Sequence, residues 1–349
     1  MSLQRIKTRI LILSDTHADP ALNSLPYPET DLAIHCGDLT EESKLHEFQT
    51  TLALLKTLPS PIKLVIAGNH DFTLDEPVFR AKASDATLRG GVSPDLLKKT
   101  YGDFGEAKAL FTSDDAHNAG IILLEEGTHC ISLPNGATIK VFASPYTPSL
   151  GDWGFQYRRY EHVWPIEEGT DIIVTHGPPK GILDITDGRS NAGCQRLFEK
   201  VNETRPLLHC FGHIHEAWGA KVVTWKENSG SEVRTSLTEV DGGSSVEVEN
   251  LGTLFREMKW DTEETKGAKK RREERRRSEG AVRSSHCVGD EVPLERGRQT
   301  LFVNAAVGGI GREEVRGQLP WLVEVELERA PLVDVDVDVD VVRGGGRSG

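Results

Sequence analysis

The chain has few cysteines and no long hydrophobic run. Its 349 residues include five cysteines, widely spaced and without a CxxC motif, which indicates reduced thiols rather than a disulfide framework. No run approaches the ~20 apolar residues that span a bilayer, so we expect no membrane insertion. The apolar stretch at residues 10–13 is too short for a secretory signal. We therefore expect an intracellular protein, in the cytoplasm, with the nucleus as the alternative.

The sequence also lacks an excess of positive charge. It has 41 lysines and arginines against 54 acidic residues, a net charge of −13. This balance argues against a general affinity for the DNA or RNA backbone, so we expect no nucleic-acid binding. It leaves a small anionic substrate open, because bound metal ions dominate the local field of a site.

Short apolar runs that end in polar clusters organise the first part of the chain. Strands are predicted at 8–13, 31–36 and 62–67. A helix is predicted at 41–58, with Thr40 as its N-cap, because apolar residues recur there at intervals of three and four. Strand, helix and strand with short connections predict a parallel, right-handed crossover. Ligands then belong at the carboxyl ends of the strands.

The middle of the chain predicts further strands and a hairpin. The Asn135-Gly136 pair between two strand-like runs is a strong hairpin signal. Short helices are predicted at 94–101 and 193–201. Other predicted strands lie at 120–125, 129–133, 171–175, 207–211, 219–225, 301–306 and 321–327.

The later part of the chain changes in composition. Residues 226–298 have little periodicity and contain the run KKRREERRR, so they predict a disordered charged insertion whose protein partners are unknown. That run fits a nuclear localisation signal or, because glutamates interrupt it, a solvated charged segment. Strand-like sequence resumes afterwards, so one domain is predicted over 1–225 plus 299–330. Alternating valine and aspartate make 331–349 a low-complexity tail.

Two polar clusters follow the first two predicted strands. Asp15 and His17 are two residues apart, so in an extended segment both side chains share a face. Asp38 follows Gly37 at a tight turn, and a carboxylate there can bridge two cations ~3.5–4 Å apart. Taken alone, the first pair also fits a loop cap, and Asp38 a helix-capping residue.

The Gly-Asn-His-Asp cluster after the third predicted strand is the most specific. Asn69 offers a neutral oxygen ligand, and His70 can stay off the metal and protonate a leaving alkoxide. Asp71 is predicted to orient and charge-stabilise the His70 imidazole. His70 and Asp71 are therefore the candidate catalytic residues.

Three more histidines follow later predicted strands. His176 comes directly after DIIVT, where a structural histidine is the alternative. His213 and His215 repeat the two-residue spacing of the first cluster. Mixed imidazole and carboxylate ligands suit Mn, Fe or Zn better than Ca or Mg.

The order of these clusters resembles the calcineurin-like metallophosphoesterase superfamily. Its motifs, DxH, GD, GNHD, H and GHxH, occur here over 10–217, and the resemblance resumes over 300–327. The stretches THGPPKGILD, DWGF and FGHIHEAWG are similar to the eukaryotic metallophosphoesterase-domain proteins, which resemble class III cyclic-nucleotide phosphodiesterases. The long insertion and the acidic tail depart from the family pattern.

The resemblance implies an α/β fold, a four-layer α/β/β/α sandwich with two divalent metal ions at one rim. One metal would be held by Asp15, His17 and His215, with Asp38 bridging, and the second by Asn69, His176 and His213. His70 would be the proton donor near the scissile ester.

The resemblance also implies a metal-dependent phosphoesterase. We expect hydrolysis of a small phosphodiester, with a cyclic nucleotide as first choice, by in-line attack of a metal-bound hydroxide. A phosphomonoesterase, including a phosphoprotein phosphatase, is the alternative, followed by a nuclease. The alternative that is not an enzyme is an inactive scaffold that binds metal.

Overall fold

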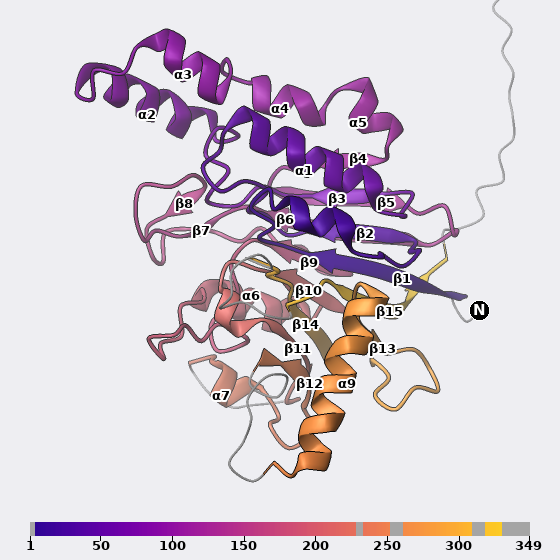
Figure 1. The fold of residues 1–349 in the computed structure, drawn as a ribbon. Helices are drawn as coiled ribbons and strands as arrows, with labels where there is room; N and C mark the ends of the chain where they lie inside the picture. Colours follow the sequence, from indigo (N-terminus) through magenta and orange to yellow (C-terminus); the bar gives the residue numbers. More distant parts are fainter. Residues whose placement is uncertain (1–3, 228–232, 252–260, 309–317, 330–349) are drawn as a thin grey trace, which may run out of the picture.

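The structure, a computed structural model, describes residues 4–227, 233–251, 261–308 and 318–329 (Figure 1). Two mixed β-sheets form its centre. The predicted tail at 331–349 lies outside the described residues.

The first sheet has the strand order β13-β15-β1-β2-β3-β4. Neighbours from β1 to β4 run parallel, and β15 pairs antiparallel with β1, which confirms the predicted parallel crossover. The strands are β1 (Arg5–Leu13), β2 (Leu32–His35), β3 (Lys63–Val65), β4 (Ile121–Leu123), β13 (Val282–Ser285) and β15 (Trp321–Glu328).

The second sheet has the order β12-β11-β14-β10-β9-β6-β5. Its central strands β6, β9, β10 and β14 are parallel, and β5 and β6 form the predicted hairpin around Asn135-Gly136. The strands are β5 (Gly127–Ser132), β6 (Thr138–Ser144), β9 (Ile172–Thr175), β10 (Leu208–Phe211), β11 (Gly219–Thr224), β12 (Val246–Asn250) and β14 (Gln299–Asn304). A separate two-stranded ribbon joins β7 (Thr147–Pro148) and β8 (Gln156–Tyr157).

Three hydrophobic cores lie between the four layers of helices and sheets. The largest lies between the sheets and includes Ile12 and Val174. On the outer side of the first sheet, Phe48 of α1 (Leu45–Thr57) contacts Phe111 of α4 (Glu106–Phe111), with α5 (Asp114–Asn118) alongside. Outside the second sheet, α6 (Gln195–Thr204) buries Phe198. Helix, sheet, sheet and helix therefore confirm the predicted four-layer sandwich (Figure 1).

Two further helices project beyond α1. The sequence predicted α3 (Pro94–Tyr101) but not α2 (Glu76–Leu88), of whose side chains Phe79 is the one that is buried. The remaining elements are η1 (Pro20–Ser24), η2 (His215–Ala217), α7 (Ser236–Glu239) and α9 (Glu263–Glu279). Among the helices described, none combines the length and apolar character needed to cross a bilayer.

The start of α1 differs from the prediction. The helix begins at Leu45 with Lys44 as its N-cap, so Thr40 is not the cap. The Thr40 hydroxyl instead donates to the Asp71 carboxylate at 2.7 Å. The same hydroxyl accepts from the Ser43 amide at 3.2 Å, but no helix begins there. Sequence spacing could not reveal the distant contact with Asp71.

The prediction of a disordered insertion at 226–298 is wrong for the part that the structure describes. Strand β12 pairs with β11 and extends the second sheet, while β13 pairs with β15 and extends the first. Both are short edge strands whose hydrogen bonds come from a buried neighbour, so they need little hydrophobic periodicity of their own. The basic run lies within helix α9. Residues 228–232 and 252–260 of this segment lie outside the described part.

Candidate metal centre

Five loops bring the predicted site residues to one rim of the sandwich. They follow β1, β2 and β3 of the first sheet and β9 and β10 of the second. Backbone bonds join the two sheets there, since the Val307 amide donates to the Ser14 carbonyl at 2.9 Å. The site is therefore assembled across the junction of both sheets.

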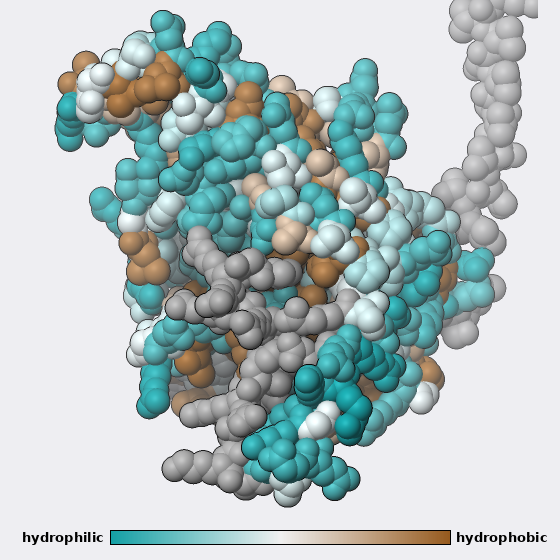
Figure 2. Space-filling view, in the orientation of Figure 1, coloured by the Kyte–Doolittle hydropathy of each residue, from teal (hydrophilic) through white to brown (hydrophobic). Residues whose placement is uncertain are grey.

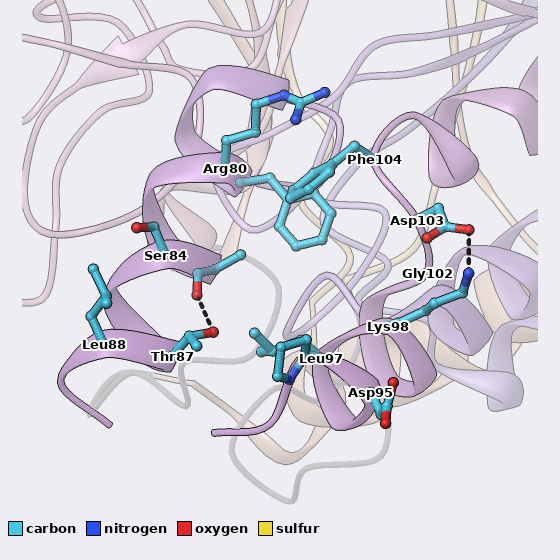
Figure 3. A pocket seen from close by; sticks show the side chains of 13 residues that line it. Arg80, Ser84, Thr87, Leu88, Asp95, Leu97, Lys98, Gly102, Asp103 and Phe104 are labelled. Carbon is cyan, nitrogen blue, oxygen red and sulfur yellow. Dashed lines mark hydrogen bonds and ion pairs between the residues drawn. The ribbon is translucent and has the colours of Figure 1, made fainter. Parts of the chain in front are cut away.

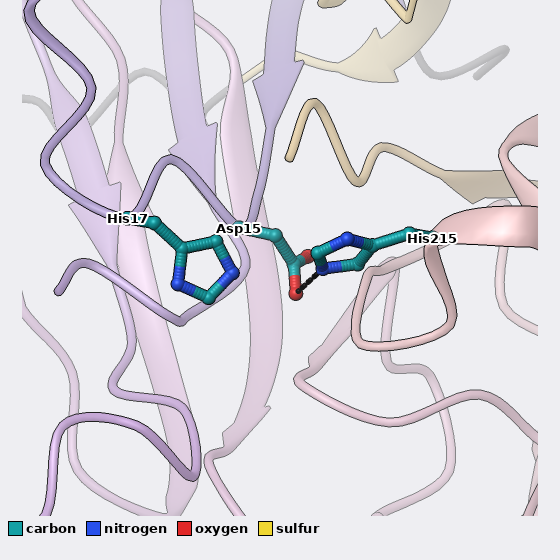
Figure 4. Close-up of side chains that lie close together, drawn as sticks. All are labelled: Asp15, His17 and His215. Carbon is teal, nitrogen blue, oxygen red and sulfur yellow. Dashed lines mark hydrogen bonds and ion pairs between the residues drawn. The ribbon is translucent and has the colours of Figure 1, made fainter. Parts of the chain in front are cut away.

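The ligand-type side chains form three overlapping groups. One contains Asp15, His17 and His215 (Figure 4), and in each group the ligand atoms lie within 4.8 Å of one another. The other two groups are His17 with Asp38 and His70, and Asp38 with His176 and His213.

Asn69 completes the arrangement. Its Oδ1 lies 2.9 Å from Nε2 of His176. All seven predicted ligands thus meet at the rim. Asp38 belongs to two of the groups, which is the place expected for a bridging carboxylate. Their roles as ligands stay a prediction.

The backbone at these loops is unusual. Asp15, His17, Asp38 and His213 have φ of 55°, 46°, 52° and 68°, in the left-handed region that non-glycine residues rarely adopt. Such conformations persist only where the surroundings hold them, and they concentrate at functional sites. Here they turn the chain sharply after each strand, so that the side chains stay at the rim.

Two glycines leave room for the site carboxylates. A Cβ on Gly68 would lie 2.3 Å from Oδ1 of Asp38, and one on Gly212 would lie 2.0 Å from Oδ2 of Asp15. Any side chain at either position would displace a candidate ligand. The glycines of the GNHD and GHIH clusters are therefore required by close approach.

Backbone carbonyls set the orientation of three imidazoles. Nδ1 of His17 lies 3.0 Å from the Thr40 carbonyl. Nδ1 of His176 lies 2.9 Å from the Cys36 carbonyl. Nδ1 of His70 lies 2.6 Å from the Glu41 carbonyl. A carbonyl only accepts, so each Nδ1 carries the proton. Each Nε2 is then left to face the rim, as histidine ligands with such supporting bonds do.

The two aspartates are charged although they are buried. Asp15 is 0% and Asp38 2% exposed. Burial alone would raise the pKa of each, but His215 beside Asp15 and His176 beside Asp38 hold both pKa values well below the ordinary range. Among the described residues, no lysine or arginine forms an ion pair with either carboxylate.

The two imidazoles grouped with Asp38, those of His176 and His213, differ in protonation. Burial lowers the pKa of His176, but Asp38 outweighs it and raises the pKa to about 9. Burial and the charge of His176 lower the pKa of His213 to about 4. Buried carboxylates that only imidazoles neutralise, with Nε2 atoms free to face them, fit divalent cations.

The contacts of Asp71 differ from the prediction. It does not bond the His70 imidazole, whose Nδ1 partner is the Glu41 carbonyl. The buried Asp71 carboxylate accepts from the amides of Leu39 and Gly68 at 3.0 and 2.8 Å. Burial, with the charge of Asp38, raises its pKa to about 7. Asp71 therefore ties the second and third loops together instead of touching the imidazole.

One neighbour of His70 was not predicted as functional. The Trp153 ring stacks on the His70 ring at a centroid distance of 4.1 Å. Trp153 is 37% exposed, so part of its indole remains open to solvent. A tryptophan beside a glycine in the DWGF stretch was the only sequence signal.

Comparisons with known proteins place these motifs in context. Residues 8–217 match the family model described as calcineurin-like phosphoesterase. The chain is 34% identical over 222 residues to metallophosphoesterase domain-containing protein 1 of Homo sapiens, covering 61% of this chain and 62% of that protein.

Two other similar proteins were found, one by sequence and one among solved structures. The chain is 35% identical to a probable rhamnogalacturonate lyase C of Emericella nidulans, covering 62% of this chain but 18% of that protein. This chain therefore spans less than two thirds of either relative. Among solved structures, TT1561 of Thermus thermophilus aligns at 12% identity and a TM-score of 0.37, over 60% of this chain and 82% of that one.

Proposed function

Because this chain belongs to the calcineurin-like phosphoesterase family, we propose that it is a metal-dependent hydrolase of phosphate esters. The observation that carries the proposal is the overlap of three ligand groups at one rim, with Asp38 shared by two of them. The proposed substrate is a small phosphodiester, and a cyclic nucleotide is the first choice. The five cysteines are all free thiols, which supports the proposed intracellular location.

The proposed ligands divide into two sets. Asp15, His17 and His215 would hold one divalent ion, Asn69, His176 and His213 would hold the other, and Asp38 would be shared. Mn, Fe or Zn is proposed because imidazole and carboxylate ligands are mixed. When bound, such ions polarise the phosphoryl group and lower the pKa of water.

His70 is the proposed proton donor. With Nδ1 engaged by the Glu41 carbonyl, its Nε2 is the atom that can deliver a proton to the leaving oxygen. The His70 amide donates to Oδ1 of Asp38 at 2.8 Å, so the same carboxylate positions the donor beside the metal ligands. Asp71 fixes this loop through its bonds to Leu39 and Gly68.

The proposal is tested by turnover. The purified chain, loaded with Mn, Fe or Zn in turn, is assayed against cyclic nucleotides, aryl phosphodiesters and aryl phosphomonoesters. We expect hydrolysis of diesters that stops on chelation and returns with metal. Hydrolysis of monoesters alone would overturn the proposed substrate class. If no ester is hydrolysed with any metal, the proposed enzymatic activity is overturned.

A further inference from the structure

A cavity lies between helices α2 and α3 beside the metal rim. Its volume is about 570 Å³, within the range of small-molecule sites. Its wall includes four aromatic side chains, those of Phe72, Phe79, Tyr101 and Trp153. Figure 2 shows hydrophobic residues gathered on the surface over α2 and α3. Apolar surface of this kind, left open by the fold, commonly marks a binding site.

The cavity is linked to the proposed proton donor through Trp153. Trp153 lines it and also stacks on His70. Glu42 lines the same edge and directly follows Glu41, whose carbonyl holds Nδ1 of His70. Trp153 and Glu42 therefore place this edge of the cavity next to the surroundings of His70.

The segment that carries Trp153 is anchored on both sides. The Gly154 amide donates to the Asn69 carbonyl at 2.9 Å, and the Phe155 amide donates to Oδ2 of Asp75 at 2.8 Å. Asp152 forms an ion pair with Lys82 of α2 at 2.7 Å. The indole is thus held in place before any ligand arrives, which lowers the entropy cost of binding.

The charges of the wall favour an uncharged occupant. Lys82, the one cation among the described residues that line this cavity, is paired with Asp152 and lies 5.1 Å from the Phe72 ring. The acidic Glu42 and Asp85 are paired with Lys44 and Arg89. Because the described wall leaves no cation unpaired, a second anionic group gains nothing there, whereas a flat ring gains from stacking.

A second cavity of about 600 Å³ lies between the same helices (Figure 3). It shares Phe79, Ala83 and Leu97 with the first, and Arg80 lies 4.2 Å from the Phe104 ring there. The described residues that line either cavity include none of the proposed ligands and not His70. The first cavity is the one lined by Trp153, which stacks on His70, so it is the one linked to the proposed site.

We propose that Trp153 and the α2–α3 cavity bind the leaving group of the substrate, and that this group carries an uncharged aromatic or heteroaromatic ring. The inference rests on the proposed function, because it assigns the cavity to the leaving-group side of that reaction. Trp153 is a specificity residue in this view, and His70 remains the group that delivers the proton.

The test fills the cavity without touching the rim. Ala86 of α2 lines the cavity, so Ala86→Trp occupies it. Ala81→Trp adds the same bulk at an exposed position of the same helix and is the matched control. Trp153→Ala removes the stacking surface. Unchanged metal content and thermal unfolding would show that each variant is folded.

Binding is measured first, since it needs no turnover. Phenylphosphonate and methylphosphonate are titrated by calorimetry into the Mn-loaded full chain. We expect the phenyl compound to bind about tenfold more tightly, as stacking on one aromatic side chain typically provides. Ala86→Trp and Trp153→Ala should reduce this preference below about twofold, and Ala81→Trp should keep it. Equal binding of the two compounds by the unaltered chain would overturn the proposal.

Turnover then separates this inference from the proposed function. In the cavity variants, kcat/KM should fall about tenfold for phenyl esters relative to methyl esters, mainly through KM. Intrinsic reactivity cancels because each variant is compared with the unaltered chain. An equal fall for both esters would overturn the cavity's role. A phenyl preference in binding without turnover of any ester would overturn the proposed function and leave the cavity as an aromatic-binding site.

Discussion

The metal rim and the α2–α3 cavity adjoin one another but are built by opposite means. At the rim, charged side chains are buried on tight turns that follow core strands: Asp15 and His176 are both 0% exposed. Around the cavity, apolar side chains stay at the surface, with Leu96 54% and Trp153 37% exposed.

The difference shows what each region requires. Buried charges need fixed partners, so the rim is specified by short motifs attached to rigid strands. The cavity needs only apolar surface and a gap between helices, and many sequences can supply both. We therefore expect changes at the rim to abolish activity, and changes around the cavity to alter which ester is used.

The strongest test of the rim is Asp38→Asn. Removing the shared carboxylate charge should lower kcat/KM by about 10³-fold or more and reduce bound metal, because the ions supply several kcal/mol of transition-state stabilisation. Turnover and metal content are measured together. Asp114→Asn, at an exposed first-turn position of α5, is the control and should change neither. Normal turnover by Asp38→Asn would refute a shared carboxylate between two ions.

The next test separates proton donation from metal binding. His70→Ala should lower kcat by about 10²-fold, within the usual range for loss of a general acid, while metal content stays unchanged. An exposed histidine of α1, His46, provides the matched control as His46→Ala. Loss of metal in the His70 variant would instead make His70 a ligand.

A third test probes close packing at the rim. Gly212→Ala places a methyl group 2.0 Å from Oδ2 of Asp15, so we expect a loss of about 1–3 kcal/mol in the free energy of unfolding and weaker metal binding. Denaturant unfolding measures the first and metal titration the second. Nothing lies within 4 Å of a Cβ built on Gly242, so Gly242→Ala should leave both unchanged.

The smallest expected effect lies on the cavity side. Asp75 caps α2 by accepting from the Val78 amide and also holds the Phe155 amide. Asp75→Ala should cost about 1 kcal/mol of stability and weaken the phenyl preference without reducing bound metal. Ser113→Ala removes a comparable cap from α5 and should lower stability alone. A loss of metal in the Asp75 variant would show that the two regions are coupled.

Sequence patterns predicted the strands and the rim well because both depend on neighbouring residues. A buried strand must be apolar, and a side chain placed just after it must lie at the edge of the sheet. Asp15 and Asp38 could therefore be placed at the carboxyl ends of parallel strands, whereas His213 was placed at the same rim by the resemblance to the family. The family model matched over 8–217 confirms the resemblance that the motifs indicated.

The errors arose where contacts are distant in sequence. Asp71 was expected to contact the adjacent imidazole, but its partners include Leu39 from the preceding loop. The segment 226–298 was expected to be disordered. Its strands β12 and β13 are instead held by hydrogen bonds to β11 and β15, and the sequence of the segment does not indicate these partners. Trp153 gave no sign of stacking on His70, because a long stretch of chain separates the two residues.

The sequence by itself determined most strands and the chemical character of the rim, because hydrophobic periodicity and motif spacing act over a few residues. The four layers were implied by the resemblance to a known family. Only the tertiary structure decided which carbonyl orients each imidazole, where Asp71 is used, and that an aromatic cavity opens beside His70. Those contacts join residues that the chain separates widely. Their free energy depends on the packing of complete elements, which no local pattern encodes.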